Sequence, residues 1–278
     1  MNFSIVTPSF RNSDWLRLCI ASVADQQGVS FEHIVQDSCS DDGTQDWLPN
    51  DRRVRAFIEK DKGMYDAVNR GYRRAQGDIL AYLNCDEQYF PGALAAVSDF
   101  FAAHPRLDVV LTDTVVVGTQ GEFICQRRSM IPLKHHIWVR FNALTCSIFI
   151  RRRVLEDFAL YFDTRWRDLG DMFWLLELVN HGVRMGVLRR FTSAFTETGE
   201  NMNLKPNACR EREEKARMVP VWVNRLEPAI VGYHRLRMLA GGDYFQRPFD
   251  YSLFTKASPE QRVLHHVGRP TARWPGRS

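Results

Sequence analysis

The sequence has 278 residues, of which 45% are hydrophobic and 25% are charged, and its formal net charge is +4. These values exclude a disordered chain and are typical of a globular protein large enough for one α/β domain with a substantial core. Because no apolar run approaches the length of a membrane span and the N-terminus lacks a signal peptide, the sequence predicts a cytosolic protein. The six cysteines show no C-x-x-C spacing, so we expect thiols rather than disulfides or a zinc site.

The positive charge belongs to the C-terminal segment. From Val231 onward, eight Arg or Lys stand against three Asp or Glu, a balance of +5, so the preceding part is nearly neutral. A charge confined to one segment gives no support for a nucleic-acid partner. It indicates instead that this segment could contact an acidic surface.

In chain order, strands and helices alternate over the first hundred residues. Short apolar runs predict strands at 3–6, 31–35, 54–58 and 79–83. Helical spacing of apolar residues lies between them, ending at Gly28 and at Gly77, and a further helix is expected after Pro91. This alternation predicts an α/β fold with a mostly parallel central sheet flanked by helices.

The pattern changes after residue 108. Short strand-like pieces lie between 109 and 125, a strand is expected at 144–150, and a helix at 169–181. After Phe191 the chain is expected to become irregular and polar, and from Arg210 onward to be helical, with breaks at Pro220 and Pro228. We therefore expect an α/β domain over 1–204 and a basic, helical C-terminal extension over 205–278.

Polar groups follow three of the predicted strands. They are Thr7-Pro8-Ser9, Asp37 and Asn84-Cys85-Asp86. Because the carboxyl ends of parallel strands meet at one edge of a sheet, these groups could share a crevice. Acidic oxygens there suit Mg²⁺ or Mn²⁺ and a phosphorylated ligand, although each residue alone would be an ordinary turn residue. Neither a G-x-G-x-x-G nor a P-loop motif is present, so those nucleotide-binding folds have no support.

Four motifs in register carry a family resemblance. They read TPSF at 7–10, IVQDSCSDDGT at 34–44, DKGMYDAVNRG at 61–71 and GDILAYLNCD at 77–86. In order and spacing they resemble the family 2 inverting glycosyltransferases, which are nucleotide-sugar enzymes of the GT-A fold. The resemblance covers about residues 3–200 and is strongest up to Pro91.

The resemblance implies a donor site and a metal site. The nucleotide-sugar would be bound by Thr7, Pro8, Ser9, Asp37, Lys62, Asn84, Cys85 and Asp86. Asn84-Cys85-Asp86 stands at the family's D-x-D position, where Asp86 would bind Mg²⁺ or Mn²⁺ bridging the donor diphosphate. This sequence departs from the fuller pattern, because Asn84 replaces the first Asp and Glu87 replaces a frequent second acid. Asp86 would then be the only direct carboxylate ligand.

The resemblance also implies a catalytic base. Asp171, at the start of the 169–181 helix, resembles the base that takes the proton from the acceptor hydroxyl, and Asp168 is the second choice. Without the resemblance, Asp171 would be read as a carboxylate that complements the helix dipole. Glu200 and Asn201 resemble a loop near the donor or the acceptor.

The function expected is therefore transfer of a sugar, with inversion, from a UDP- or GDP-sugar to a glycan or lipid-linked glycan, as in bacterial polysaccharide biosynthesis. Two alternatives are a non-catalytic nucleotide- or glycan-binding relative and a sugar nucleotidyltransferase. The basic extension, rich in aromatic residues, could lie on anionic lipid at the inner face of the plasma membrane. It could equally pack on the catalytic domain or pair two subunits as a homodimer.

Overall fold

The computed structural model describes residues 1–141, 143–199 and 206–275. Strands and helices alternate through the first half, as predicted. The elements are β1 (Asn2–Ser9), α1 (Ser13–Ala24), β2 (Ser30–Asp37), α2 (Thr44–Trp47), β3 (Arg55–Ile58), α3 (Met64–Arg74), β4 (Ile79–Tyr82), β5 (Glu87–Tyr89) and α4 (Ala93–Ala103). The second half contains β6 (Val109–Val117), β7 (Phe123–Arg127), α5 (Lys134–Val139), β8 (Ile148–Arg151), α6 (Arg152–Phe158), α7 (Gly170–Asn180) and β9 (Met185–Thr196).

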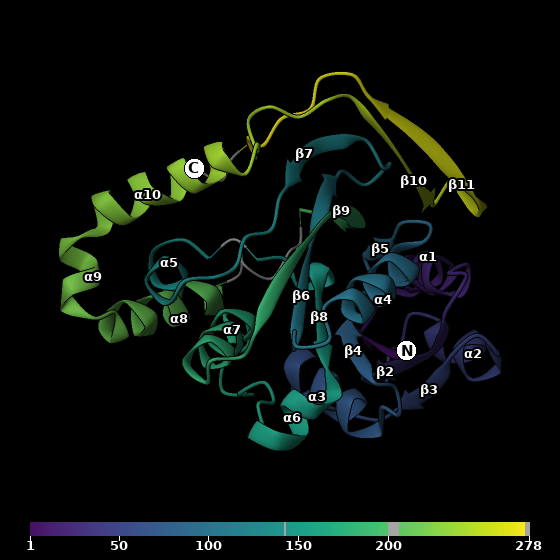
Figure 1. Ribbon diagram of the computed structural model, residues 1–278. Helices are drawn as coiled ribbons and strands as arrows, with labels where there is room; N and C mark the ends of the chain where they lie inside the picture. Colours follow the sequence, from purple (N-terminus) through teal and green to yellow (C-terminus); the bar gives the residue numbers. More distant parts are fainter. Residues whose placement is uncertain (142, 200–205, 276–278) are drawn as a thin grey trace.

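The strands from β1 to β9 form one sheet in the order β3-β2-β1-β4-β8-β6-β9-β5, and β7 pairs with β6 (Figure 1). β1 runs parallel to β2 and to β4, and β2 runs parallel to β3, so the predicted parallel sheet is confirmed. Beyond β4 the sheet becomes mixed, because β8 runs antiparallel to both β4 and β6. The carboxyl ends of β1, β2 and β4 therefore lie at one edge.

Both faces of the sheet are buried, which explains why the central strands read as continuous apolar runs. In β4, Ile79 and Ala81 belong to the core cluster shared with α1 and α4, whereas Leu80 and Tyr82 belong to the cluster shared with α3 and α7. Successive side chains of a strand point to opposite faces. The result is a helix–sheet–helix sandwich that fixes the strand ends.

The prediction that the chain becomes irregular after Phe191 is wrong for the next five residues, because β9 continues to Thr196. Its last part contains the polar residues Thr192 and Ser193, and this hid the strand. Both are nevertheless buried, and they pair across the sheet with β6. The Thr192 hydroxyl lies 2.6 Å from that of Thr112, and the Ser193 hydroxyl lies 3.1 Å from that of Thr114.

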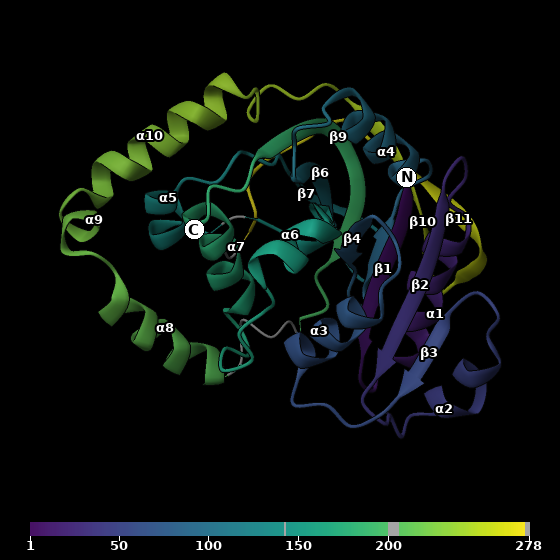
Figure 2. The same ribbon diagram turned by 60° about the horizontal axis from the view of Figure 1, so that its bottom comes forward.

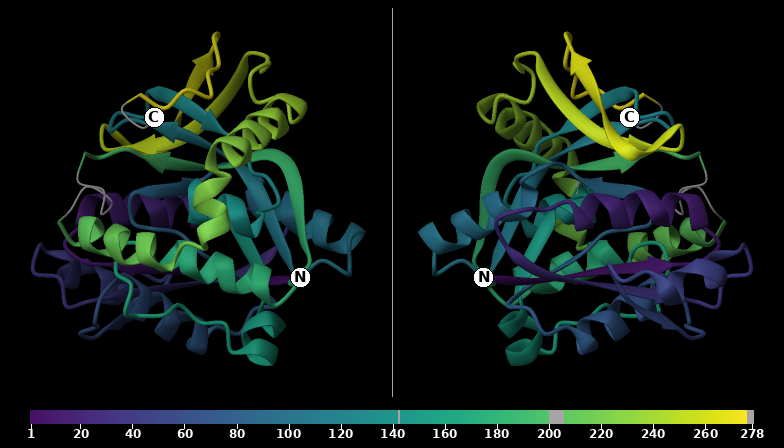
Figure 3. Two further views of the ribbon diagram at one scale, coloured as in Figure 1. Left: turned by 90° about the vertical axis from the view of Figure 1, so that its left-hand side faces the viewer. Right: turned by 90° about the vertical axis from the view of Figure 1, so that its right-hand side faces the viewer.

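The predicted helical extension is confirmed up to residue 240 and wrong beyond it. α8 (Pro206–Met218), α9 (Val221–Arg225) and α10 (Glu227–Ala240) form an arc that passes around α5 and α7 (Figure 2). β10 (Phe249–Thr255) and β11 (Ser258–Val267) then form an antiparallel hairpin that lies over the main sheet (Figure 3). Among the residues described, none of the helices is both long and apolar enough to cross a membrane.

The hairpin packs against the main sheet. Tyr251 and Leu253 point into a core cluster with Val115 and Ala194 of the main sheet. Arg262, whose side chain is only 10% exposed, binds Asp25 and the Tyr89 carbonyl oxygen (2.9 Å). Apolar residues alternate with polar ones at 249–255, which is typical of a strand. The residues on which this strand packs, such as Val115 and Ala194, lie far away in the chain.

Candidate active site

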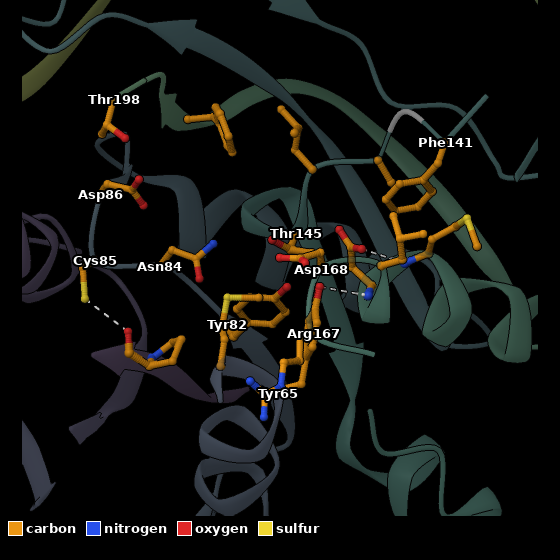
Figure 4. Close-up of a pocket in the computed structure, with 18 of the residues that line it drawn as sticks. Tyr65, Tyr82, Asn84, Cys85, Asp86, Phe141, Thr145, Arg167, Asp168 and Thr198 are labelled. Carbon is orange, nitrogen blue, oxygen red and sulfur yellow. Dashed lines mark hydrogen bonds between the residues drawn. The ribbon is translucent and has the colours of Figure 1, made fainter. Parts of the chain in front are cut away.

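A cavity of about 1630 Å³ opens at the carboxyl ends of the parallel strands (Figure 4). Pro8 and Ser9 at the end of β1, Ser38 after β2, and 84–86 after β4 form one wall. The opposite wall comes from the loop before α7 and from α8 and α10 of the extension. The strand ends that the sequence singled out thus share one cavity with the C-terminal arc.

The predicted donor residues are mostly on the cavity wall. Six of the eight line it, namely Pro8, Ser9, Lys62, Asn84, Cys85 and Asp86. A hydrogen bond from the Cys85 thiol to the Pro8 carbonyl oxygen (3.1 Å) joins the ends of β4 and β1. The two strand ends are therefore fixed relative to each other.

Thr7 and Asp37 lie behind the wall instead. Both are fully buried and do not line the cavity. The Thr7 hydroxyl is 2.8 Å from the His33 ring nitrogen Nε2. The Asp37 carboxylate accepts hydrogen bonds from the Ser40 amide (2.8 Å) and hydroxyl (2.7 Å). In this structure Thr7 joins β1 to β2, and Asp37 shapes the loop that carries Ser38 to the wall.

Asp86 is the carboxylate available for a metal. It lines the cavity, and burial raises its pKa to about 6, so binding a cation would favour its charged form. Glu87 faces the protein instead, where burial raises its pKa to about 8 and one oxygen accepts the Asn84 amide (2.8 Å). No cluster of three or more His, Cys, Asp or Glu able to hold a metal occurs within residues 1–141, 143–199 and 206–275. Asp86 with the Asn84 amide oxygen still offers the hard oxygen atoms that Mg²⁺ or Mn²⁺ takes beside a diphosphate.

Asp171 lies across the cavity, in the first turn of α7. Its amide donates to the Tyr65 hydroxyl (3.1 Å), and its Oδ1 accepts the Met172 amide (2.8 Å). Gly170 permits this approach, since a Cβ there would lie 2.5 Å from the Tyr65 ring. Burial, with a smaller contribution from the charge of Asp168, raises the pKa of Asp171 to about 7. A carboxylate with a pKa near neutrality is suited to general-base catalysis.

The loop before α7 is held by a residue that the sequence analysis did not identify. The Glu211 carboxylate of α8 is 1% exposed and accepts the amides of Arg167 (2.7 Å), Asp168 (3.0 Å) and Leu169 (2.9 Å). Asn207 Nδ2 donates to Asp168 (2.7 Å) and to Glu211 (2.8 Å). Nothing local marks Glu211, because its partners lie about forty residues earlier in the chain.

Other cavity residues were also missed. Arg140, Phe141, Thr145 and Lys215 line the cavity although no motif contains them. In the view of Figure 4, Asn84 and Tyr82 lie between Asp86 and Asp168, and Thr198 lies near Asp86. The two predicted acceptor residues, Glu200 and Asn201, lie outside the described residues.

Comparison with known proteins identifies the family. A family model described as Glycosyl transferase family 2 matches residues 4–157, more than half of the chain. The chain belongs to this family. The glycosyltransferase is 31% identical to a PGL/p-HBAD biosynthesis glycosyltransferase of Mycobacterium bovis (strain BCG / Pasteur 1173P2) over 179 residues, which are 61% of this chain and 66% of that protein.

Solved structures share the fold of this glycosyltransferase. S. aureus TarS in complex with UDP-GlcNAc superimposes with a TM-score of 0.60 at 18% identity, over 74% of this chain and 61% of that one. The mannosyltransferase PcManGT of Pyrobaculum calidifontis, in complex with GDP-Man and Mn²⁺, gives 0.51 at 18% identity, over 70% of this chain and 56% of that one. These similarities establish the expected GT-A fold.

Proposed function

We propose that this family 2 glycosyltransferase transfers a sugar from a UDP- or GDP-sugar to a hydroxyl of a glycan or lipid-linked glycan, with inversion at the anomeric carbon. The observation that carries the proposal is the pair of carboxylates, Asp86 and Asp171, on different walls of a single cavity. One stands where a donor diphosphate would meet a cation. The other stands where an acceptor hydroxyl would lose its proton.

In the proposed mechanism, Asp171 removes the proton from the acceptor hydroxyl as its oxygen attacks the anomeric carbon. The bond from that carbon to the diphosphate oxygen breaks on the opposite side, and the electron pair leaves with the nucleoside diphosphate. The raised pKa of Asp171 makes it a stronger base than an exposed carboxylate. Tyr65 holds the Asp171 backbone, and stacking on Phe162, with ring centroids 5.0 Å apart, supports Tyr65 in turn.

We propose that Mg²⁺ or Mn²⁺ is held by Asp86, with Asn84 as a second oxygen ligand. When bound, the ion supplies positive charge beside the departing diphosphate. Pro8, Ser9 and Lys62 would contact the rest of the donor. The solved complexes of the same fold with UDP-GlcNAc and with GDP-Man and Mn²⁺ make uracil and guanine the first nucleobases to test.

Two other functions have less support. A non-catalytic relative would not need both carboxylates, yet Asp86 and Asp171 both line the cavity. A sugar nucleotidyltransferase needs a Gly-rich basic loop after the first strand to hold a triphosphate. The residues at that place read TPSFRN.

The proposal is tested by thermal stabilisation with UDP, GDP, CMP, TDP and ATP, with and without Mn²⁺, followed by sugar transfer from the matching donor. A ligand that binds the folded protein raises its melting temperature. We expect a Mn²⁺-dependent shift with one nucleoside diphosphate, lost in Asp86→Ala and kept in Asp171→Asn. We also expect transfer to be lost in both variants. A protein that is stabilised by none of the nucleotides would contradict the proposal.

We also propose that the enzyme works peripherally at the inner face of the plasma membrane, where a lipid-linked acceptor would be presented. The support is a set of exposed apolar side chains on the C-terminal arc, among arginines. Pairing of two subunits through the same surface is the competing explanation. Vesicle co-sedimentation and light scattering distinguish membrane binding from subunit pairing.

A further inference from the structure

The tip of the C-terminal hairpin, where β10 turns into β11, reaches the strand-end side of the cavity. Lys256 stands in this turn, and it lines the cavity together with Arg11 and Trp15, which belong to the loop after β1 and to the start of α1. The family match ends at residue 157, so the hairpin lies outside the matched region. The cavity therefore includes a basic residue that the family motifs do not supply.

The hairpin runs beside β5 and α1 (Figure 1), and hydrogen bonds fix where its tip lies. Arg262 donates to the carbonyl oxygens of Ser252 and Tyr89 (2.9 Å each). Two residues further along β10, the Gln88 side chain donates to the Phe254 carbonyl oxygen (2.8 Å) and accepts from its amide (2.9 Å). β10 therefore advances toward its tip as β5 is followed back toward the end of β4.

The contacts of Lys256 place it beside the start of α1. Its ammonium nitrogen is 4.7 Å from the centroid of the Trp15 ring and 3.3 Å from a carboxylate oxygen of Asp14. Trp15 in turn packs against a core cluster that contains Cys85. Together with the course of β10, these contacts bring Lys256 to the strand end that carries Asp86, the proposed metal ligand.

The ion pair of Lys256 leaves its ammonium group available to a phosphate. The side chain of Asp14 is 73% exposed and that of Lys256 is 42% exposed. An exposed pair of this kind stabilises a protein little, because water hydrates both groups. A diphosphate carries more negative charge than one carboxylate, so it would compete successfully for the ammonium group. Lysine suits this task, because it binds phosphate as a point charge on a flexible stem.

Other charged side chains on this side of the cavity already have a partner or a proposed role. Arg11 forms a bidentate ion pair with Asp41 (2.6 and 2.7 Å). Asp61 accepts a backbone amide (2.9 Å), and the charge of Asp86 would be offset by the ion that it is proposed to hold. Lys256 is therefore a cation that this side of the cavity can offer to a bound anion.

We infer that Lys256 contacts the diphosphate of the nucleotide-sugar donor, next to the ion held by Asp86, so that the C-terminal hairpin completes the donor site. The inference rests on the proposed function and names a further residue of the same site. A positive charge at this place would bind the two phosphates and leave the nucleobase and the ribose to the residues at the strand ends.

The test measures the affinity of the full chain for UDP and uridine, and for GDP and guanosine, with Mn²⁺ present. We expect Lys256→Ala to bind the preferred diphosphate about tenfold more weakly. Its affinity for the matching nucleoside should stay unchanged, because the nucleoside has no phosphate to contact. Lys256→Arg keeps the charge and should recover most of the affinity, and raised salt should reduce the difference between the variants.

Two control variants separate binding from support of the hairpin. Arg269→Ala removes a positive charge from an exposed position of the same extension that does not line the cavity, and should change neither affinity. Asp14→Asn removes the ion-pair partner of Lys256 but leaves its ammonium group in place, so it should bind the diphosphate at least as tightly as the unmodified protein. Without ligand, Lys256→Ala and both controls should melt close to the unmodified protein, because the groups they remove are exposed.

Three results would overturn the inference and leave Lys256 as a contact that supports the hairpin. They are undiminished affinity of Lys256→Ala for the diphosphate, an equal loss of affinity for the nucleoside, and the same loss in Asp14→Asn. In each of them the unmodified protein still binds a nucleoside diphosphate. An unmodified protein that bound neither UDP nor GDP would contradict the proposed function itself, so the two failures are distinguishable.

Discussion

Asp171 determines the expected pH dependence of sugar transfer. A base must be ionised to accept a proton, and burial raises the pKa of Asp171 to about 7. We therefore expect kcat/KM to fall about tenfold per pH unit below that value and to level off above it. A pH profile with saturating Mn²⁺ measures this, since the metal keeps Asp86 ionised. Activity that stays constant on acidification well below pH 7 would exclude Asp171 as the base.

The same carboxylate is expected to lower stability at alkaline pH. Its folded-state pKa is raised, so the folded protein holds the proton more tightly than the unfolded chain, and this contribution is lost as the pH rises through about 7. Asp171→Asn stays neutral at every pH. We expect the variant to melt about 2 °C or more above the unmodified protein at alkaline pH, and the difference to shrink as the pH falls toward about 4, where Asp of the unfolded chain is also protonated. Scanning calorimetry at both pH values, with Asp168→Asn for comparison, tests the sign.

At the residue scale, local motifs placed Asp86, Asp171 and most of the strand-end residues that the structure brings to the cavity. Asp86 follows a buried strand and Asp171 opens a helix, so their positions depend on nearby sequence. The motif did not show that Thr7 and Asp37 point behind the wall, because the neighbours that take up their polar atoms, such as His33, are set by packing. The role of Glu211 could not be predicted either, because the backbone amides that it binds are brought to it by packing.

Among the elements, α8 has the clearest testable role, since Glu211 holds the loop that leads into α7. Glu211→Ala leaves three backbone amides without their acceptor, and we expect a loss of about 1–3 kcal/mol in the free energy of unfolding. We also expect kcat to fall more than the affinity for nucleotide, because the loop positions Asp171 and not the donor. Denaturant titration and steady-state kinetics measure the two effects.

Two further variants distinguish positioning from general destabilisation. Glu211→Gln keeps one amide oxygen as an acceptor, so it should recover part of kcat and of stability. Glu213→Ala, an exposed neighbour on α8, should match the unmodified protein. If Glu211→Ala lowered stability with kcat unchanged, the carboxylate would be a structural contact alone.

Element types were predictable wherever periodicity was strong. The β1–α4 region alternates cleanly because β1 and β4 are buried on both faces and the helices that flank them on one. β9 was not predictable, since its buried Thr192 and Ser193 look like loop residues until β6 supplies their partners. The hairpin β10–β11 likewise depends on distant contacts, among them the pair of hydrogen bonds between the Gln88 amide and the Phe254 backbone (2.8 and 2.9 Å).

At the scale of the whole molecule, the arc of α8 to α10 has two roles. Its inner side lines the cavity with Lys215 and Arg235, and Glu211 holds the loop before α7. Its outer side carries exposed apolar side chains, including Trp222 (51% exposed), Leu236 (62%) and, just after α10, Phe245 (74%). The same arc therefore joins the cavity to an exposed apolar surface.

The outer side of the arc should bind anionic membranes. Trp222 and Phe245 could insert among lipids while Arg225 and Arg247, both exposed, meet the headgroups. We expect co-sedimentation with phosphatidylglycerol vesicles, weaker at high salt and absent with neutral phosphatidylcholine vesicles. Trp222→Glu or Phe245→Glu should lower partitioning about tenfold or more, because each removes a large apolar side chain from the contact.

Leu264→Glu is the control, because Leu264 is also exposed (70%) but lies on β11, away from the arc. It should sediment like the unmodified protein. Light scattering of the same variants decides between lipid and a second subunit. A dimer that Trp222→Glu dissociates, together with vesicles that never bind, would assign the apolar surface to subunit pairing. A monomer that binds vesicles through Trp222 would place the acceptor cavity at the membrane surface, because the same arc forms both.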